Sequence, residues 1–326
     1  MPDRAMIEAE GLVKRYGATV ALAGVDLSVP KGAILGVLGP NGAGKTTAIR
    51  ILTTLSHPDQ GRAWVAGFDV AAHPGEVRRR IGVAAQATTL DELLTGRQNL
   101  EMVGQLSGLR RTEARARAAD LLERLELSDA AGRLTKGYSG GMRRRLDLAA
   151  SMIMRPPVLF LDEPTTGLDP ASRLGVWEVI RGMVGDGCTV LLTTQYLDEA
   201  DHLADSIAVF DHGRVIASGT PQQLKAETGS ARLEVTLSAP RPEAVIALQP
   251  LLEGEAHVSH DGRRLRAAVL NREGIATAAV RALDRAGILV DDVQVHQPSL
   301  DDVFLALTGR ETADEESANE REIATA

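Results

Sequence analysis

A glycine-rich stretch at residues 39–47 constrains the fold of this chain more than any other part of the sequence. An apolar run of strand length, 34–38, comes before it, and the pattern of 46–55 predicts a helix directly after it. Glycines in such a place let consecutive backbone N–H groups turn inward, where the positive end of the helix also points. We therefore expect an α/β fold with an anion-binding loop at the edge of a sheet. The stretch consists of Gly39, Pro40, Asn41, Gly42, Ala43, Gly44, Lys45, Thr46 and Thr47.

Lys45 and Thr46 make this loop specific for nucleotides. The spacing G-x-x-x-x-G-K-T is typical of loops that bind the phosphates of a nucleoside triphosphate. In such a loop Lys45 pairs with the β- and γ-phosphates, and the Thr46 hydroxyl ligates Mg²⁺. The alternative is a glycine-rich turn that binds nothing, and the strand before it and the helix after it argue against that alternative.

Asp162 and Glu163 are two adjacent carboxylates that follow the apolar run 158–161. That run predicts a strand buried on both faces, as in a parallel sheet. Carboxylates at the end of a buried strand are costly unless they serve metal or proton chemistry. We predict that Asp162 holds Mg²⁺ and that Glu163 orients or activates the attacking water. A solvated strand end is the alternative.

Ser139, Gly140 and Gly141 form a second anion-binding pattern at the predicted start of a helix that continues through 143–150. A hydroxyl, free N–H groups and the helix dipole would all point in one direction. The alternative is an ordinary helix N-cap with a flexible lead-in, and the phosphate-binding loop favours the functional interpretation.

Composition limits the partners of the chain. The net charge of −8 argues against nucleic acid as the main partner, and a large part of it lies in the tail 311–326, which holds six acidic residues and one arginine. The arginine runs 78–80 and 143–145 are short and lack interleaved aromatics, so we interpret them as solvated faces or interface contacts. Cys188 is the only cysteine, which suits a reducing cytoplasm, and no apolar run is long enough to cross a bilayer.

The order of predicted elements indicates two domains and a tail. The pattern of 1–228 predicts an α/β domain whose helical lobe spans about 91–155. The pattern of 229–310 predicts a second domain with the element order βαββαβ, which is the ferredoxin-like order. The acidic segment 311–326 is expected to be disordered. Thr112 is the predicted N-cap of a helix that runs to about 127. A later helix is predicted to have one apolar face, which consists of Leu174, Trp177, Ile180 and Val184.

Three motifs in this order resemble those of an ATP-binding cassette, the nucleotide-binding subunit of ABC transporters. They are 39–46, 138–142 and 159–164, with the serine-glycine-glycine pattern between the other two. This order separates the family from GTPases and kinases, which share only the first motif. The resemblance covers about residues 6–225 and implies a P-loop NTPase cassette that binds and hydrolyses ATP with Mg²⁺.

The resemblance also implies roles for single residues. Tyr16 alone would be an ordinary half-buried strand end, but in this family an aromatic near the N-terminus stacks on adenine. Gln86 matches the glutamine loop, which touches Mg²⁺ and relays motion to the membrane partner, and Asp169 matches the D-loop at the dimer interface. Gln195 stands where the family usually has histidine. Glutamine can donate a hydrogen bond to a γ-phosphate but cannot carry a proton, so we expect slower hydrolysis.

A closer resemblance is to the ATPase subunits of drug-resistance exporters of the daunorubicin/doxorubicin type. It depends on three segments, 91–100, 193–200 and 299–309, and extends the similarity to about residue 309. That subfamily carries an additional C-terminal domain, which it uses in subunit assembly.

The resemblance implies a head-to-tail homodimer with two ATP molecules between its subunits, because the signature serine acts on the γ-phosphate held by the other copy. It also implies a separate membrane permease, and hence a peripheral location on the cytoplasmic face of the membrane. The main alternatives are a soluble cassette ATPase that acts on ribosomes or nucleic acid, and an importer ATPase.

Overall fold

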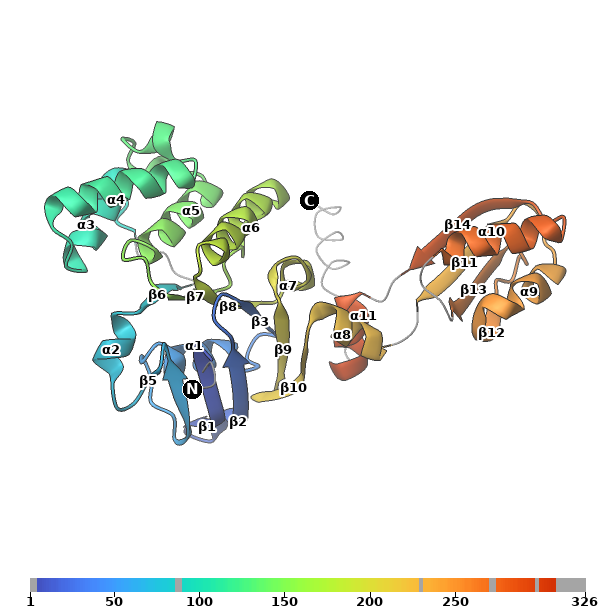
Figure 1. Cartoon of the computed structure of the whole chain (residues 1–326), viewed down its shortest axis with the longest axis horizontal. Helices are drawn as coiled ribbons and strands as arrows, with labels where there is room; N and C mark the ends of the chain where they lie inside the picture. The colour runs from blue at the N-terminus through green and yellow to red at the C-terminus, as the bar shows by residue number, and fades with distance from the viewer. Residues whose placement is uncertain (1–4, 86–89, 229–230, 270–273, 297–298, 309–326) are drawn as a thin grey trace, which may run out of the picture. The chain divides into compact units, whose positions relative to one another are not determined.

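The computed structural model describes residues 5–85, 90–228, 231–269, 274–296 and 299–308. The chain divides into two compact units, Met1–Pro221 and Gln222–Ala326 (Figure 1). The predicted site residue Gln86 and the acidic tail 311–326 lie outside the described residues.

A six-stranded, mostly parallel sheet forms the centre of the first unit. Its strand order is β10-β9-β3-β8-β7-β6, and only the β9–β10 pair is antiparallel. In register, Asp162 lies opposite Thr193 and Leu38 lies opposite Thr194, so the segments that follow β3, β7 and β8 leave the sheet at one edge. The strands are β3 Ile34–Leu38, β6 Ile81–Ala84, β7 Val158–Asp162, β8 Thr189–Thr194, β9 Ser206–Asp211 and β10 Arg214–Gly219.

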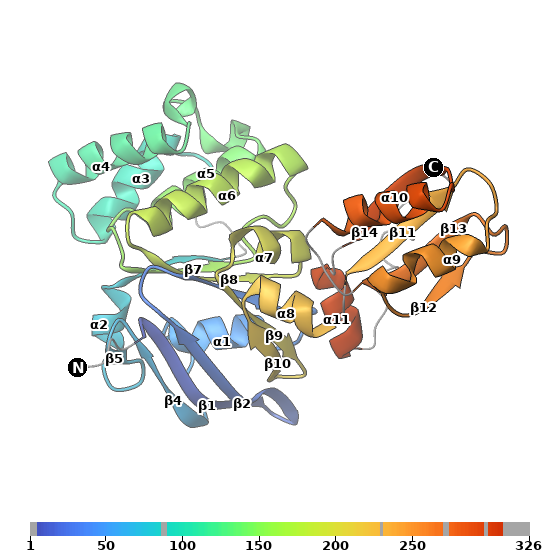
Figure 2. The same ribbon diagram turned by 45° about the vertical axis from the view of Figure 1, so that its right-hand side comes forward.

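A second, antiparallel sheet covers the helix that follows the glycine-rich loop. This helix, α1 (Lys45–Leu52), contributes Ile49, Ile51 and Leu52 to a core that also contains residues of both sheets, and it lies between them (Figure 2). The burial of α1 fixes the loop before it relative to the parallel sheet. The antiparallel sheet has the order β2-β1-β4-β5 and consists of β1 Ile7–Tyr16, β2 Thr19–Val29, β4 Gln60–Val65 and β5 Phe68–Asp69.

The helical lobe lies between β6 and β7 in the sequence, as predicted, and its leucines share a core with α6 and the parallel sheet. Two details of the prediction are wrong. The second lobe helix begins at Arg111 rather than after Thr112, because Glu113 accepts a hydrogen bond from the Arg110 backbone N–H. Leu174 is 53% exposed, whereas Trp177 and Ile180 are buried and Val184 packs half-buried against the core, as expected. In place of Leu174, α6 buries Val176 and Met183. The helices are α2 Pro74–Arg78, α3 Gly96–Leu106, α4 Arg111–Arg124, α5 Gly140–Ser151, α6 Pro170–Gly185 and α7 Leu197–Leu203.

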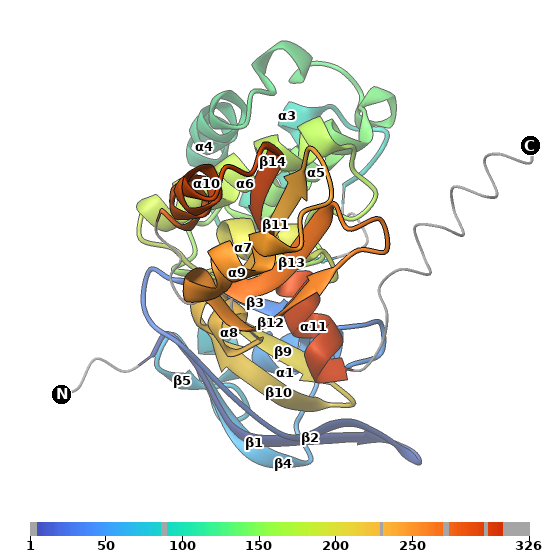
Figure 3. The same ribbon diagram turned by 90° about the vertical axis from the view of Figure 1, so that its right-hand side faces the viewer.

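The second unit is an antiparallel sheet of order β12-β13-β11-β14 with two helices packed against each other and against its core (Figures 1 and 3). Its element order is the predicted βαββαβ; the ferredoxin-like classification stays a prediction. None of the helices in the described ranges is long and apolar enough to cross a bilayer. The elements are α8 Pro221–Thr228, β11 Arg232–Leu237, α9 Glu243–Leu248, β12 Leu252–Val258, β13 Arg264–Val269, α10 Ile275–Arg285, β14 Val290–His296 and α11 Leu300–Thr308.

Candidate active site

Close backbone contacts give the glycine-rich loop its shape. A Cβ atom on Gly39 would lie 2.3 Å from the carbonyl oxygen of Phe210 in β9. A Cβ atom on Gly44 would lie 2.5 Å from the carbonyl oxygen of Ala21 in β2, and Gly44 has a φ of 108°, in the region that favours glycine. Only glycine fits either position, so the loop is packed tightly between the two sheets.

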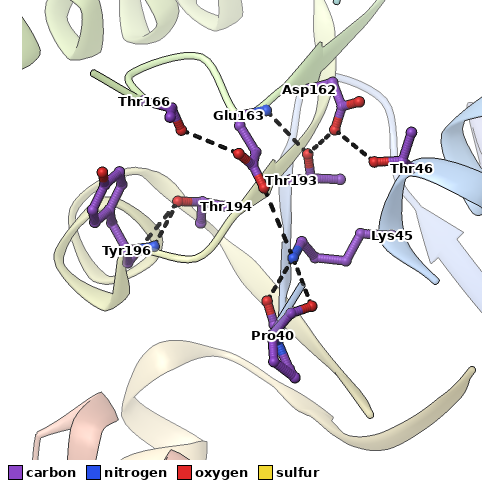
Figure 4. A network of polar contacts seen from close by, with 10 residues as sticks. Pro40, Lys45, Thr46, Asp162, Glu163, Thr166, Thr193, Thr194 and Tyr196 are labelled. Atoms are coloured by element: carbon purple, nitrogen blue, oxygen red, sulfur yellow. Dashed lines mark hydrogen bonds and ion pairs between the residues drawn. The ribbon is translucent and has the colours of Figure 1, made fainter. Parts of the chain in front are cut away.

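Lys45 directs its ammonium group back toward this loop (Figure 4). Its Nζ donates hydrogen bonds to the carbonyl oxygens of Gly39 at 2.5 Å and Pro40 at 3.1 Å, and it lies 4.0 Å from Oε1 of Glu163. Burial lowers the pKa of the Lys45 ammonium, while the nearby carboxylates of Glu163 and Asp162 act to raise it. The side chain is 5% exposed, so its charge acts in a region with little solvent screening.

Asp162 lies at the end of β7 and accepts two hydrogen bonds on the same carboxylate oxygen. Thr193 of β8 donates at 2.6 Å and Thr46 of α1 donates at 3.4 Å (Figure 4). A buried carboxylate next to a hydroxyl is the oxygen donor set that Mg²⁺ prefers. Thr46 and Asp162 therefore fit the ion that the resemblance implies.

Glu163 has a backbone conformation that is rare for a residue other than glycine. Its φ is 48°, in the left-handed region. Its N–H donates to both the carbonyl oxygen and the hydroxyl oxygen of Thr193, each at 3.1 Å, and Oε2 accepts a hydrogen bond from the Thr166 hydroxyl at 3.2 Å. Lys45, Thr46, Asp162, Glu163 and Thr193 together form the Lys45 cluster, and these contacts direct the Glu163 carboxylate toward Lys45 within it (Figure 4).

Gln195 and Tyr16 lie at the ends of strands and are exposed. Gln195 directly follows β8, and its side chain forms no hydrogen bond with another described residue. Tyr16 ends β1 with 49% of its surface exposed, and the Lys14 ammonium lies 5.5 Å from the centre of its ring. Among the described residues, no hydrogen bond or ion pair joins either side chain to the Lys45 cluster, and both are exposed to solvent.

Ser139, Gly140 and Gly141 lie at the start of α5, next to the N-terminus of α6. Ser139 is the N-cap, and its Oγ accepts a hydrogen bond from Met142 N–H at 3.3 Å. A Cβ atom on Gly141 would lie 2.6 Å from the hydroxyl oxygen of Ser172. Among the described residues no hydrogen bond joins this serine-glycine loop to the Lys45 cluster.

Asp169 caps α6 and lies close to the same loop. Its two carboxylate oxygens accept hydrogen bonds from the backbone N–H of Ser172 at 2.9 Å and from the Ser172 hydroxyl at 2.6 Å. These hydrogen bonds lower the pKa of the Asp169 carboxyl. Both predicted interface motifs, the Ser139 loop and Asp169, therefore meet at Ser172.

The prediction that 143–145 is a solvated or interface face is wrong for Arg144. This residue is 7% exposed, and its guanidinium points toward the end of β7. Arg143 and Arg145, in contrast, pair with Glu92 and Glu126 at 3.0 and 3.2 Å. The only signal in the sequence was Asp147, three residues after Arg144 and on the same helix face.

Two family models match the chain. One is described as ABC transporter and matches residues 22–166; the other is described as ATP-binding protein DrrA1-3-like, C-terminal domain, and matches residues 219–308. The chain is 53% identical to the daunorubicin resistance ATP-binding protein DrrA2 of Streptomyces coeruleorubidus, over 97% of this chain and 98% of that protein. It is 52% identical to the daunorubicin/doxorubicin resistance ATP-binding protein DrrA of Streptomyces peucetius, over 99% of each.

Solved structures agree with this similarity. A dimeric ATP-binding cassette, MJ0796, in a post-hydrolysis state bound to ADP and Pi, matches with a TM-score of 0.60 and 25% identity. The match covers 66% of this chain and 98% of that one. The common part has the size of the first unit.

Proposed function

The chain belongs to the ATP-binding proteins of ABC transporters and hydrolyses ATP, and on that premise we propose that it drives efflux of a drug or hydrophobic small molecule through a separate membrane permease. The names of its relatives support a drug as the transported molecule, because the similarity to these resistance proteins extends over nearly the full chain. The observation that carries the mechanism is the 4.0 Å distance between Lys45 Nζ and Glu163 Oε1.

Each residue of the cluster has a defined task in this mechanism. Lys45 neutralises negative charge on the β- and γ-phosphates of ATP, and the loop N–H groups bind the same oxygens. Glu163 orients the attacking water and accepts a hydrogen bond from it. Gln195, exposed at the adjacent strand end, donates a hydrogen bond to the γ-phosphate, and Tyr16 stacks on adenine.

Thr46 and Asp162 are the residues that would hold Mg²⁺. When bound, the ion supplies positive charge against the phosphate oxygens. The hydrogen bond from Thr193 keeps the shared oxygen of Asp162 directed toward Thr46. Gln86, whose contact with the same ion is only an expectation from the resemblance, completes the proposed set.

The proposed catalytic unit is a head-to-tail homodimer. In each subunit Ser139, Gly140 and Gly141 share no hydrogen bond with the described Lys45 cluster, which is consistent with their acting on ATP held by a second copy. Asp169, beside them at the start of α6, would lie at the same interface. ATP binding would close the dimer and hydrolysis would open it, and this motion would pass to the permease at the cytoplasmic face of the membrane.

Glu163→Gln tests the proposal because it keeps the shape of the side chain and removes its basicity. We expect ATP hydrolysis to fall by about 100- to 10,000-fold, the usual contribution of a general base, with ATP binding retained. Cells that produce the permease with this variant should accumulate daunorubicin as cells without the pair do. Glu178→Gln, on the exposed surface of α6, is the matched control and should leave hydrolysis and efflux unchanged. Full turnover by Glu163→Gln would refute the mechanism; normal efflux with impaired hydrolysis would refute the coupling.

A further inference from the structure

Arg144 connects α5 to the strand end that carries Glu163. Its guanidinium donates to four backbone carbonyl oxygens: Nε to Pro164 at 2.6 Å, one terminal nitrogen to Asp162 at 3.1 Å and Glu163 at 3.2 Å, and the other terminal nitrogen to Ala85 at 2.8 Å. Asp162 is the last residue of β7, Glu163 and Pro164 follow it, and Ala85 follows the last residue of β6. One side chain therefore supplies donors to three consecutive carbonyls, those of residues 162–164, and to the carbonyl of Ala85.

The charge of Arg144 is compensated inside the protein. Asp147, on the same face of α5 and 3% exposed, lies 3.3 Å from the guanidinium. Burial lowers the pKa of Arg144, whereas the carboxylates of Asp147, Glu199 and Asp162 act to raise it. Because the pKa of arginine is very high in water, the group stays charged at neutral pH. The Arg144 guanidinium is therefore a planar cation whose hydrogen bonds have fixed directions.

This arrangement holds both peptide planes that flank the Cα atom of Glu163. The carbonyl of Asp162 belongs to the peptide before that Cα atom, and the carbonyl of Glu163 belongs to the peptide after it. A single terminal nitrogen of Arg144 donates to both. The rotations about φ and ψ of Glu163 are thereby restricted, at a residue whose φ of 48° is otherwise unfavourable.

We propose that Arg144 is a positioning residue, which holds the strained backbone of Glu163 so that its carboxylate faces the Lys45 cluster. The inference deepens the proposed function and rests on the role of Glu163 in it. Arg144 also donates a hydrogen bond to the carbonyl of Ala85, the residue before Gln86. The end of β6, the end of β7 and helix α5 are therefore connected through one guanidinium. Since Ser139 is the N-cap of α5, movement of its loop when a second copy binds would reach Glu163 through this side chain.

A double-mutant cycle tests this role. Arg144→Met keeps an unbranched side chain over the first part of the arginine and removes all of its donors. We expect turnover per ATP-binding site to fall by about 10- to 100-fold, as for a small misplacement of a reacting group. The affinity of the protein for ATP should stay within about twofold, since Arg144 does not contact the loop of residues 39–47. In a Glu163→Gln background, Arg144→Met should cause no further loss, because Arg144 acts through Glu163.

Arg145→Met is the matched control. Arg145 lies on the same helix but donates to the carbonyl of Leu125 and the carboxylate of Glu126, far in sequence from the strand end. Its turnover per site should equal that of the unmodified protein. Arg144→Lys is the second variant if Arg144→Met does not fold: one ammonium cannot reproduce the fork, so turnover should fall with the same non-additivity.

The outcomes separate this inference from the proposed function. Normal turnover of Arg144→Met or Arg144→Lys per ATP-binding site would overturn the positioning role. If Arg144→Met lowers turnover in the Glu163→Gln background by the same factor as in the unmodified protein, Arg144 has only a structural role. If Glu163→Gln alone keeps full turnover, the proposed function fails first.

Discussion

At the scale of single residues, the site brings two carboxylates to one ammonium group. Asp162 and Glu163 both act on Lys45, and Lys45 and Asp162 are largely buried. The group as a whole carries one negative charge, which does not favour a polyanion such as ATP. Backbone N–H groups at the start of α1 and a divalent cation are the two sources that can reverse this balance. We therefore expect nucleotide binding by this chain to depend on Mg²⁺.

Cys188 offers a prediction that concerns one residue and no part of the site. Burial raises the pKa of the Cys188 thiol from 9.0 to about 11, and the thiol donates to the carbonyl of Pro156 at 3.4 Å. Because only the thiolate reacts, we expect alkylation by iodoacetamide at pH 8 to be about 100-fold slower in the folded protein than in the unfolded one. Mass spectrometry measures this rate directly, since the chain has no other cysteine. Equal rates in the two states would contradict the prediction.

Residue types in the sequence identified the Lys45 cluster but not the buried Arg144 that holds the backbone beside it. Lys45, Thr46, Asp162 and Glu163 follow predicted strands or begin a predicted helix, and carboxyl ends of neighbouring parallel strands must meet at one edge. Their proximity was therefore predictable. The burial of Arg144 was not, because its four acceptors are backbone atoms, which have no signature in the sequence.

At the scale of elements, strong patterns predicted the core well. The apolar run 34–38 forms the buried strand β3, and the run 158–161 forms β7, which extends one residue further, to Asp162. The errors occurred where competing local contacts decide the result. In α4, Glu113 accepts a hydrogen bond from the Arg110 N–H, so the helix begins at Arg111 and Thr112 lies inside it. In α6, Val176 and Met183 are buried and Leu174 is exposed. Helical periodicity alone does not choose between Leu174 and Val176, because both lie within one turn of the buried Trp177.

Glu199 in α7 connects three elements and gives a prediction on pH. It is fully buried and accepts hydrogen bonds from the Thr165 hydroxyl at 2.9 Å and the Trp177 indole at 3.1 Å. Burial raises the pKa of the Glu199 carboxyl above its ordinary value of 4.5, against hydrogen bonds from Thr194, Thr165 and Trp177. The neutral carboxyl therefore stabilises the fold fully below pH 4.5, and this contribution is lost as the pH rises through the higher pKa of the folded state.

Glu199→Gln should remove that part of the pH dependence, because the amide keeps an acceptor for the two donors and does not ionise. We expect the variant to gain free energy of unfolding relative to the unmodified protein as the pH rises above 4.5, by about 1.4 kcal/mol for each unit of difference between the folded and unfolded pKa. Urea titrations at several pH values measure it. Glu178→Gln, on the exposed surface of α6, should follow the unmodified protein at every pH. A constant difference between Glu199→Gln and the unmodified protein would contradict the shift.

At the scale of the whole molecule, the proposed dimer divides each site between two chains. Lys45 would act on ATP in its own subunit, and Ser139 on ATP in the other. Lys45→Ala should therefore abolish hydrolysis and ATP-driven dimerisation, whereas Ser139→Ala should bind ATP as a monomer but fail to hydrolyse it efficiently. Light scattering with and without ATP, together with binding of a fluorescent ATP analogue, distinguishes the two defects. Ser128→Ala, an exposed serine in the helical lobe, is the control.

Mixing the two defective proteins gives the most direct prediction of a shared site. A mixed dimer contains one site in which both changes meet and one site that has an intact Lys45 from one chain and an intact Ser139 from the other. Because the mixed dimer can hold ATP at its intact site, an equal mixture should recover part of the normal turnover, although neither protein is active alone. A self-contained phosphate-loop enzyme behaves differently, because Ser139→Ala would keep its activity and the mixture would only dilute it. Absence of recovery, with each protein folded and able to exchange subunits, would refute the head-to-tail arrangement.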